Sequence, residues 1–202
     1  MPWRPLKPMQ NFITQLTFSI SLIQQNLPIL LWYLAVLWVL NIINWAMGSR
    51  LFIFGIYPRH LRGLPGIICA PWLHKDFSHL FYNSIPLILL ACGVLINGWP
   101  MFVEITMIIV ILSGIFTWLG GRPGIHIGAS GLIMGYWAYL LAFAYWSSSP
   151  VGIIVGIIAL YYFGSLAANL LPTTERVSWE GHIYGFIAGL LAAAWQFGII
   201  HI

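Results

Sequence analysis

Charged residues are scarce in this chain of 202 residues: they make up 6% of the sequence, while apolar residues make up 60%. A water-soluble domain needs roughly a quarter of its residues charged to cover its surface. The composition therefore excludes an ordinary soluble domain and a disordered chain. The net charge of +4 comes from cations spread thinly along the chain, which excludes a nucleic-acid-binding face. A membrane protein with several helices of about 20 apolar residues fits this composition.

Cysteine and aspartate are almost absent as well. Cys69 and Cys92 are the two cysteines, too few for a disulfide framework, and we expect both to be small apolar packing residues. Asp76 is the single aspartate. An aspartyl protease mechanism needs two aspartates, so this chemistry is excluded.

Six strongly apolar stretches predict six transmembrane helices, because each is long enough to cross about 30 Å of hydrocarbon. They are residues 29–47, 77–96, 101–119, 129–147, 150–171 and 181–200. Most of the joints contain helix breakers, such as the Asn-Gly-Trp-Pro run at 97–100 and the Pro-Thr-Thr run at 172–174. The fold class that follows is an all-α membrane protein.

The chain before the first stretch has a different pattern. Apolar residues at helical spacing between Met9 and Ile23 predict an amphipathic helix in the membrane interface that ends before Pro28. We therefore divide the chain into an N-terminal interfacial segment, residues 1–26, and a six-helix membrane domain, residues 27–202.

The connection between the first two helices is unusually long. Residues 48–76 are rich in glycine and proline but also contain many large apolar side chains. We expect this loop to be partly embedded in the membrane. With six spans, the side that holds both termini carries Arg4 and Lys7. The other side carries the remaining cations, Arg50, Arg59, Arg62, Lys75, Arg122 and Arg176, which the positive-inside rule would place in the cytoplasm.

Polar side chains at helix depth are costly in a membrane and therefore mark function. They gather at the starts of three expected helices: His74, His79 and Asn83 at the second, Ser130 at the fourth and His182 at the sixth. Even-numbered helices cross the membrane in the same direction. These residues should therefore lie in one layer, near one surface.

Glycines predict which helices touch. The fourth helix has Gly128, Gly131 and Gly135, and the sixth has Gly181, Gly185 and Gly189 at intervals of four. Such spacing allows helix backbones to approach closely in lipid. Close packing of these two helices would bring Ser130 beside His182.

A serine beside a neutral histidine in a dry site is an arrangement for nucleophilic acyl transfer. His182 could accept the proton of Ser130 as its oxygen attacks a carbonyl. The resulting oxyanion needs donors in place, and the backbone N–H of Ser130 with the side chains of Asn83 and His79 could supply them.

Three motifs together resemble the rhomboid intramembrane serine proteases: His-Lys-Asp-Phe-Ser-His-Leu-Phe-Tyr-Asn at 74–83, Gly-Ala-Ser-Gly at 128–131, and Gly-His-Ile-Tyr-Gly at 181–185 continuing to Gly189. The similarity covers about residues 29–200. It implies a six-helix rhomboid-like bundle that cleaves a substrate's transmembrane segment or its flank. It also implies a site that opens through a water-filled cavity to the extracytoplasmic side of a membrane, which we expect to be the bacterial inner membrane.

The resemblance implies a role for each motif residue. Ser130 is the nucleophile, His182 the base, and Asn83 and His79 contribute to the oxyanion hole. Supporting positions are His74, Gly128, Gly131 and Gly185. Family members often have an aromatic residue four positions after the nucleophile, where this chain has Met134. The loop cations argue against the family's orientation, and we follow the family because three motifs outweigh one set of charges.

Several alternatives remain for these residues. His79 and Asn83 could form structural hydrogen bonds between helices. His74 fits a structural role better than a direct role in catalysis. His126 could line the rim of the cavity, while His60 and His201 fit loop or terminal positions. None of the acids Asp76, Glu104, Glu175 and Glu180 is placed to complete a triad, so we predict a dyad.

Metal chemistry has little support in the sequence. A His-Glu-x-x-His zinc motif is missing, since Lys75 follows His74 and Leu80 follows His79. A site built from His74, His79 and His182 would lack the usual carboxylate or thiolate. We expect no metal or cofactor.

The expected partners are transmembrane protein substrates and the lipid bilayer, with no nucleic acid, and the oligomeric state is left open. A second function fits the same residues: a proteolytically inactive rhomboid-like membrane protein that binds clients in the cavity.

Overall fold

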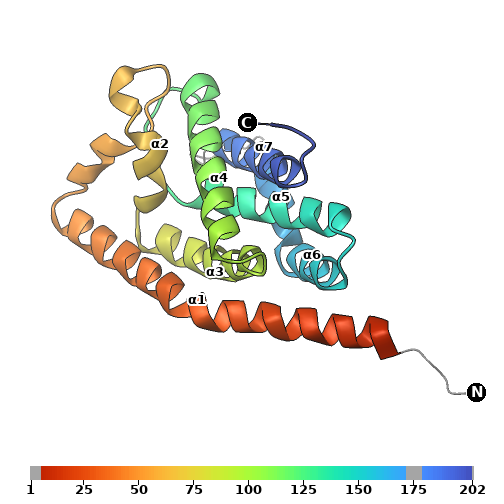
Figure 1. Ribbon diagram of the computed structural model, residues 1–202. Coiled ribbons are helices and arrows are strands. Elements are labelled where there is room, and N and C mark those ends of the chain that lie inside the picture. Colours follow the sequence, from red (N-terminus) through yellow and green to blue (C-terminus); the bar gives the residue numbers. More distant parts are fainter. Residues whose placement is uncertain (1–5, 172–178, 202) are drawn as a thin grey trace, which may run out of the picture.

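The computed structural model describes residues 6–171 and 179–201, which form a bundle of helices (Figure 1). The longer helices are α1 (Leu6–Ala46), α3 (Phe77–Leu95), α4 (Trp99–Gly120), α5 (Ser130–Trp146), α6 (Pro150–Phe163) and α7 (Trp179–Gln196). Within the described ranges there is no β-strand, only a single bridge between Ile56 and His126. The all-α class is therefore confirmed. Arg4, Glu175, Arg176 and the joint at 172–174 lie outside the described residues.

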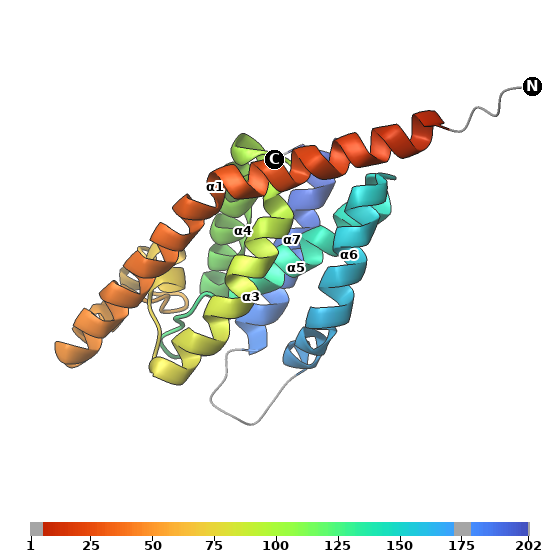
Figure 2. The ribbon, with the colours of Figure 1, turned by 90° about the horizontal axis from the view of Figure 1, so that it is seen from below.

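The predicted helix end before Pro28 is wrong, because α1 continues through this residue. A proline inside a helix removes one backbone hydrogen bond and crowds the preceding turn, which bends a helix without having to end it. Figure 2 shows α1 bending in its middle part, where its red colour gives way to orange. The boundary between the predicted segments 1–26 and 27–202 therefore falls inside one helix.

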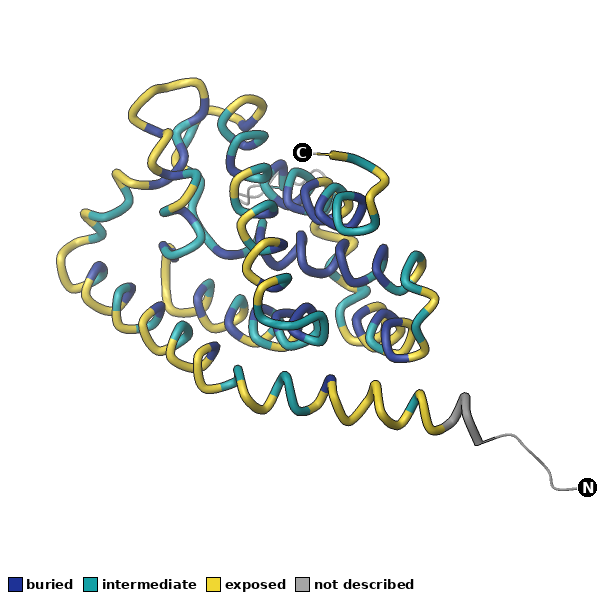
Figure 3. The backbone as a smooth tube through the Cα atoms, in the orientation of Figure 1, coloured by how far each residue is buried: buried dark blue, intermediate teal, exposed yellow. Residues whose placement is uncertain are grey.

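Four segments of the described chain are long and apolar enough to cross a membrane, which identifies an integral membrane protein. They are Gln10–Ala46, Phe77–Leu95, Trp99–Gly120 and Pro150–Leu170, the last comprising α6 and the 3-10 helix η4 (Gly164–Leu170). α5 and α7 are not among them. Figure 3 shows long buried runs on both of these helices, whereas α1 is largely exposed. Protein therefore covers much of α5 and α7.

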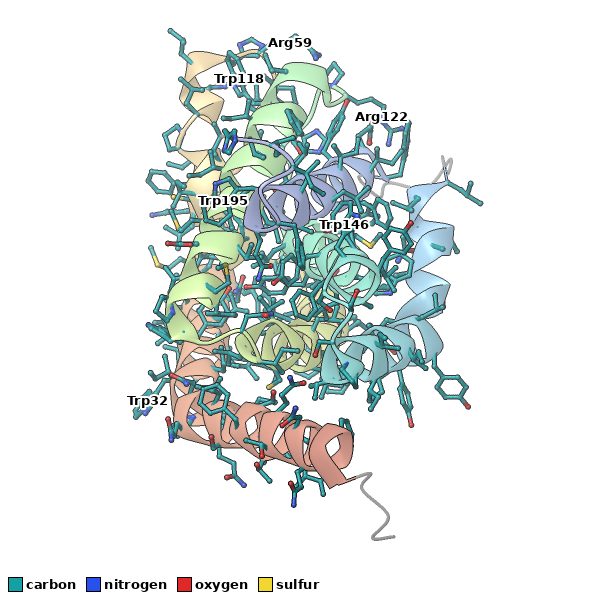
Figure 4. All side chains as sticks on the ribbon, turned by 45° about the vertical axis from the view of Figure 1, so that its right-hand side comes forward. Trp32, Arg59, Trp118, Arg122, Trp146 and Trp195 are labelled. Carbon is teal, nitrogen blue, oxygen red and sulfur yellow. The ribbon has the colours of Figure 1, made fainter. Side chains whose placement is uncertain are left out.

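The long loop folds into short helical turns instead of an irregular coil. These are η1 (Arg50–Phe54), η2 (Leu61–Gly63), α2 (Gly66–Cys69) and η3 (Ala70–Trp72). The guanidinium of Arg59 donates to the carbonyl oxygens of Leu119 and Gly121, where α4 ends, at 3.2 and 2.9 Å. The indole of Trp118 donates to the carbonyl of His60 at 2.9 Å. Figure 4 shows Arg59 and Trp118 together at this end of the molecule.

The predicted contact between the two glycine-bearing helices is confirmed. A Cβ atom built on Gly185 of α7 would collide with the carbonyl oxygen of Gly131 on α5, and one built on Gly189 would collide with that of Gly135. Only glycine leaves room for backbones this close. The start of α5 and the start of α7 are thereby held side by side.

A methyl group at this contact should destabilise the protein. Replacement of Gly185 by alanine forces the two backbones apart, and we expect the free energy of unfolding to fall by about 1–3 kcal/mol. Thermal unfolding in detergent would measure it. Gly164→Ala is the matched control, because its nearest neighbour, the Cδ1 atom of Leu160, lies 4.0 Å from the added Cβ. Equal melting of both variants would contradict the proposed close packing.

Candidate active site

One cavity of about 700 Å³ joins the starts of α3, α5 and α7. Ser130, His182, His79 and Asn83 all line it. The end of η4 closes another side of the cavity with Leu166 and Asn169. The structure thus brings the four residues singled out in the sequence around one space.

The loop that leads to Ser130 is held by backbone contacts. The N–H of Gly128 donates to the carbonyl of Ala70 at 2.9 Å, and the N–H of Ala129 donates to Nε2 of His74 at 3.3 Å. Gly128 has φ +119°, and a Cβ atom there would lie 2.8 Å from Cε1 and 2.9 Å from Nε2 of His79. This position therefore requires glycine. Ser130 follows as the first residue of α5, so its backbone N–H is not used by the helix.

His182 lies in the first turn of α7, and 7% of its surface is exposed. Its Nδ1 atom is 3.0 Å from the carbonyl oxygen of Asn169. A carbonyl can only accept, so Nδ1 carries the proton and Nε2 keeps its lone pair. This is the tautomer that a general base needs. In the structure His182 makes no hydrogen bond to Ser130.

The imidazole of His79 has the opposite tautomer. Its Nδ1 accepts the backbone N–H of Lys75 at 3.5 Å, which leaves the proton on Nε2, the atom that lies against Gly128. Asp76 caps α3 by accepting the N–H of His79 at 2.9 Å and so fixes where this helix begins. A donor N–H is thus placed beside the loop of Ser130.

Asn83 lies one turn further along α3. Its Nδ2 atom is buried and has no hydrogen-bond partner, although buried donors normally have one. Because Asn83 lines the same cavity as Ser130, an oxygen atom bound there could accept this N–H. The arrangement suits the capture of a developing negative charge.

His74 is fully buried beneath the site and connects three segments. Its backbone N–H donates to Oδ1 of Asn41 on α1 at 2.7 Å, and its carbonyl accepts the indole N–H of Trp45 at 2.9 Å. Burial, with the neighbouring His79, lowers the pKa of His74 to about 3. The ring is therefore neutral at pH 7, and Nε2 can accept the N–H of Ala129. These are contacts that a structural residue would make.

The hydrogen-bond partner of Nδ1 of His182 is a backbone carbonyl and not an acid. Asp76 caps α3, Glu104 is exposed near the start of α4, and Glu180 forms an ion pair with Arg122. No carboxylate within the described ranges hydrogen-bonds to His182. A triad with a described carboxylate bonded to His182 is therefore not formed in this structure.

The other histidines, Met134 and the two cysteines lie in different parts of the structure. His126 lines the cavity, as does Met134, while the ring of His60 packs on Tyr57 and His201 is exposed near the C-terminus. Both Cys69 and Cys92 are free thiols. No group of three or more metal-ligating side chains with the arrangement of a metal site occurs in the part of the chain that the structure describes.

Sequence reasoning missed three contributors to this site. Asn41 supports His74 from α1, the carbonyl of Asn169 orients His182, and Glu180 pairs with Arg122. Asn41 had a signal, because it interrupts an apolar stretch just as the recognised polar residues do. A backbone carbonyl leaves no signal in a sequence, since every residue has one.

Comparison with known proteins finds one matching domain family and several related proteins. The model of the Rhomboid domain matches residues 62–198. An uncharacterized protein of Mycobacterium tuberculosis is 39% identical over 173 residues, which cover 81% of this chain and 72% of that protein. An uncharacterized protein of Mycobacterium leprae is 35% identical over 173 residues, covering 81% of this chain and 68% of the relative.

Proposed function

The chain belongs to the rhomboid family, and from this premise we propose that it is an intramembrane serine endopeptidase. It hydrolyses peptide bonds in or next to the transmembrane segments of other membrane proteins. The observation that carries the proposal is the single cavity lined by Ser130, His182, His79 and Asn83. A nucleophile, a base of the correct tautomer and two donors share that space.

The proposed reaction proceeds through an acyl-enzyme. The Oγ atom of Ser130 attacks the substrate carbonyl while Nε2 of His182 takes its proton. The oxyanion is stabilised by the backbone N–H of Ser130, Nδ2 of Asn83 and Nε2–H of His79. His182 then protonates the leaving amine, and water hydrolyses the ester. The hydrogen bond from Ser130 to His182 forms when substrate binds, as catalytic hydrogen bonds often tighten only in the complex.

In the membrane, we propose six spans, with α5 packed among α3, α4, α6 and α7, and with α7 packed against α4, α5 and η4. This explains why these two helices can carry polar residues: they face protein and cavity more than lipid. The loop of residues 48–76 is partly embedded, as its exposed Ile53 and Leu61 side chains suggest. The site faces the extracytoplasmic side of a bacterial inner membrane, from which water enters the cavity.

The preferred substrate is a transmembrane segment that is locally unstable as a helix. A peptide carbonyl inside a regular helix is hydrogen-bonded and shielded, so it cannot reach Ser130. Glycine or proline near the cut would expose it. Selection then depends on how easily the substrate unwinds beside the cavity.

The test is cleavage of a panel of single-span membrane proteins by the purified chain in lipid vesicles, with the cut mapped by mass spectrometry. We expect cuts within or next to the spanning segment, and none with Ser130→Ala. The second candidate, an inactive client-binding protein, rests on the absence of a Ser130–His182 hydrogen bond. Stable binding of panel members without any cut, by folded wild-type protein, would favour it and refute the protease.

A further inference from the structure

Arg122 and Glu180 form an ion pair that joins two segments next to the proposed dyad. Nε of Arg122 donates to Oε1 of Glu180, and an Nη atom of Arg122 donates to Oε2 at 3.2 Å. The guanidinium also lies 5.7 Å from the centre of the Trp179 ring. Arg122 lies in the loop before Ser130, whereas Glu180 lies two residues before His182. Figure 4 shows Arg122 beside α7.

The carboxylate of this pair is almost inaccessible. The side chain of Glu180 is 5% exposed, and that of Arg122 is 53% exposed. A buried carboxylate is costly unless it is paired with good geometry. The two parallel N–H···O bonds provide that geometry. They fix the relative orientation of the guanidinium and the carboxylate as well as the distance between them. This bidentate pair therefore constrains the relative position of the segments that carry Arg122 and Glu180 more than an exposed ion pair with one hydrogen bond would.

The pair connects a rigid loop to a helix end. The loop before Ser130 is pinned at His126, which exchanges two backbone hydrogen bonds with Ile56 at 2.8 and 3.0 Å. Nε2 of His126 also lies 2.9 Å from the carbonyl oxygen of Arg122. Arg122 is therefore attached to a framework that already holds the nucleophile.

His182 lies in the first turn of α7, where the backbone N–H groups have no partners within the helix. The closest contacts of the α7 glycines with α5 are at Gly185 and Gly189, one and two turns further on, whereas the carbonyl oxygen of Gly181 lies 3.3 Å from a Cβ atom built on Gly131. The carboxylate of Glu180 lies at the N-terminus of α7, where the helix dipole favours a negative charge. Its ion pair with Arg122 connects this first turn to the loop before Ser130.

We propose that Arg122 and Glu180 are positioning residues that set the distance between His182 and Ser130. The inference rests on the proposed function and adds residues that contact neither substrate nor the reacting atoms. Loss of either partner lets the first turn of α7 shift relative to the loop of Ser130. Proton transfer is sensitive to such a shift, because displacement by about 1 Å can cost up to 10²-fold in rate.

The test is the rate at which a fluorophosphonate probe modifies Ser130 in the full chain in lipid vesicles. We expect Arg122→Gln and Glu180→Gln each to lower the maximal rate about tenfold with the half-saturating probe concentration unchanged. The double variant should also lose about tenfold, not a hundredfold, because two partners of one interaction are not additive. Arg122→Lys, which keeps the charge but loses the bidentate geometry, should recover part of the rate.

Arg62→Gln is the matched control, since it removes a cation of the long loop whose guanidinium lies over Tyr57; its rate should stay within twofold of wild type. All rates are measured well below each variant's unfolding temperature. Unchanged maximal rates in folded single variants, or additive losses, would overturn the positioning role while wild-type labelling sustains the protease. If Glu180→Gln fails to fold, Arg122→Gln decides alone. Folded wild-type protein that is never labelled would refute the protease and this inference together.

Discussion

Replacement of His182 by alanine is expected to slow fluorophosphonate modification of Ser130 by on the order of 10⁴-fold. A serine hydroxyl is a weak nucleophile until a base accepts its proton. In the structure Nδ1 of His182 is occupied by the carbonyl of Asn169, so Nε2 is the nitrogen that can act. His79, which also lines the cavity, cannot take its place through Nε2, because that nitrogen carries the proton. Labelled peptide quantified by mass spectrometry over time would give the rate.

The matched control for this experiment is His60→Ala. His60 packs its ring on Tyr57, and its carbonyl, which alanine retains, accepts the indole N–H of Trp118. Its labelling rate should equal that of wild type. A His182→Ala protein that folds and labels at the wild-type rate would show that the base is another group, and labelling at a serine other than Ser130 would remove the nucleophile assignment.

Much of the fold follows from two simple patterns. Long apolar stretches between breakers predict the positions of α3, α4, α5 and α7 within a few residues, because a membrane leaves few alternatives to helices. The stretch 150–171 corresponds to α6 together with the 3-10 helix η4. The spacing of Gly185 and Gly189 opposite Gly131 and Gly135 predicts which helices touch, since only small residues allow that approach. The same contact explains how residues far apart in sequence come to line one cavity.

The wrong helix boundary has an instructive cause. The sequence predicts a helix end before Pro28, because proline lacks a backbone N–H and restricts the residue that precedes it. α1 instead continues through Pro28 as one bent helix. The residues around Pro28 are mostly good helix formers. Ending the helix and starting another would leave several backbone groups unpaired at the new ends, whereas a bent continuous helix loses one hydrogen bond at the proline.

The contacts around the site show a different limit of sequence reasoning. The spacing predicts that Glu180 does not complete a triad, because it lies two residues from His182 and so on another face of α7. That face meets the loop of Arg122, a partner 58 residues away. The position of each residue in the sequence does not predict that the two form an ion pair. Whether two residues distant in sequence form an ion pair depends on the path of the folded backbone. Composition and periodicity do not predict that path.

Replacement of Asn83 by alanine should lower kcat for peptide cleavage by about 10²–10³-fold, with little change in KM. The Nδ2 donor of Asn83 is buried without a partner in the structure. An oxygen that binds beside Ser130 can accept this N–H, and the hydrogen bond is strongest when that oxygen carries charge. Loss of a donor of this kind raises the barrier without weakening ground-state binding. Steady-state cleavage of one substrate by both proteins would separate the two constants.

Asn97→Ala is the matched control, because Asn97 lies just beyond the opposite end of α3, where its amide donates to the hydroxyl of Tyr139 at 3.1 Å. It should lower the unfolding temperature and leave kcat unchanged. If Asn83 were mainly glue between helices, both variants would behave alike: each would lose stability and neither would lose kcat. A fall in kcat confined to Asn83→Ala, in protein that is as stable as wild type, assigns its amide to the oxyanion.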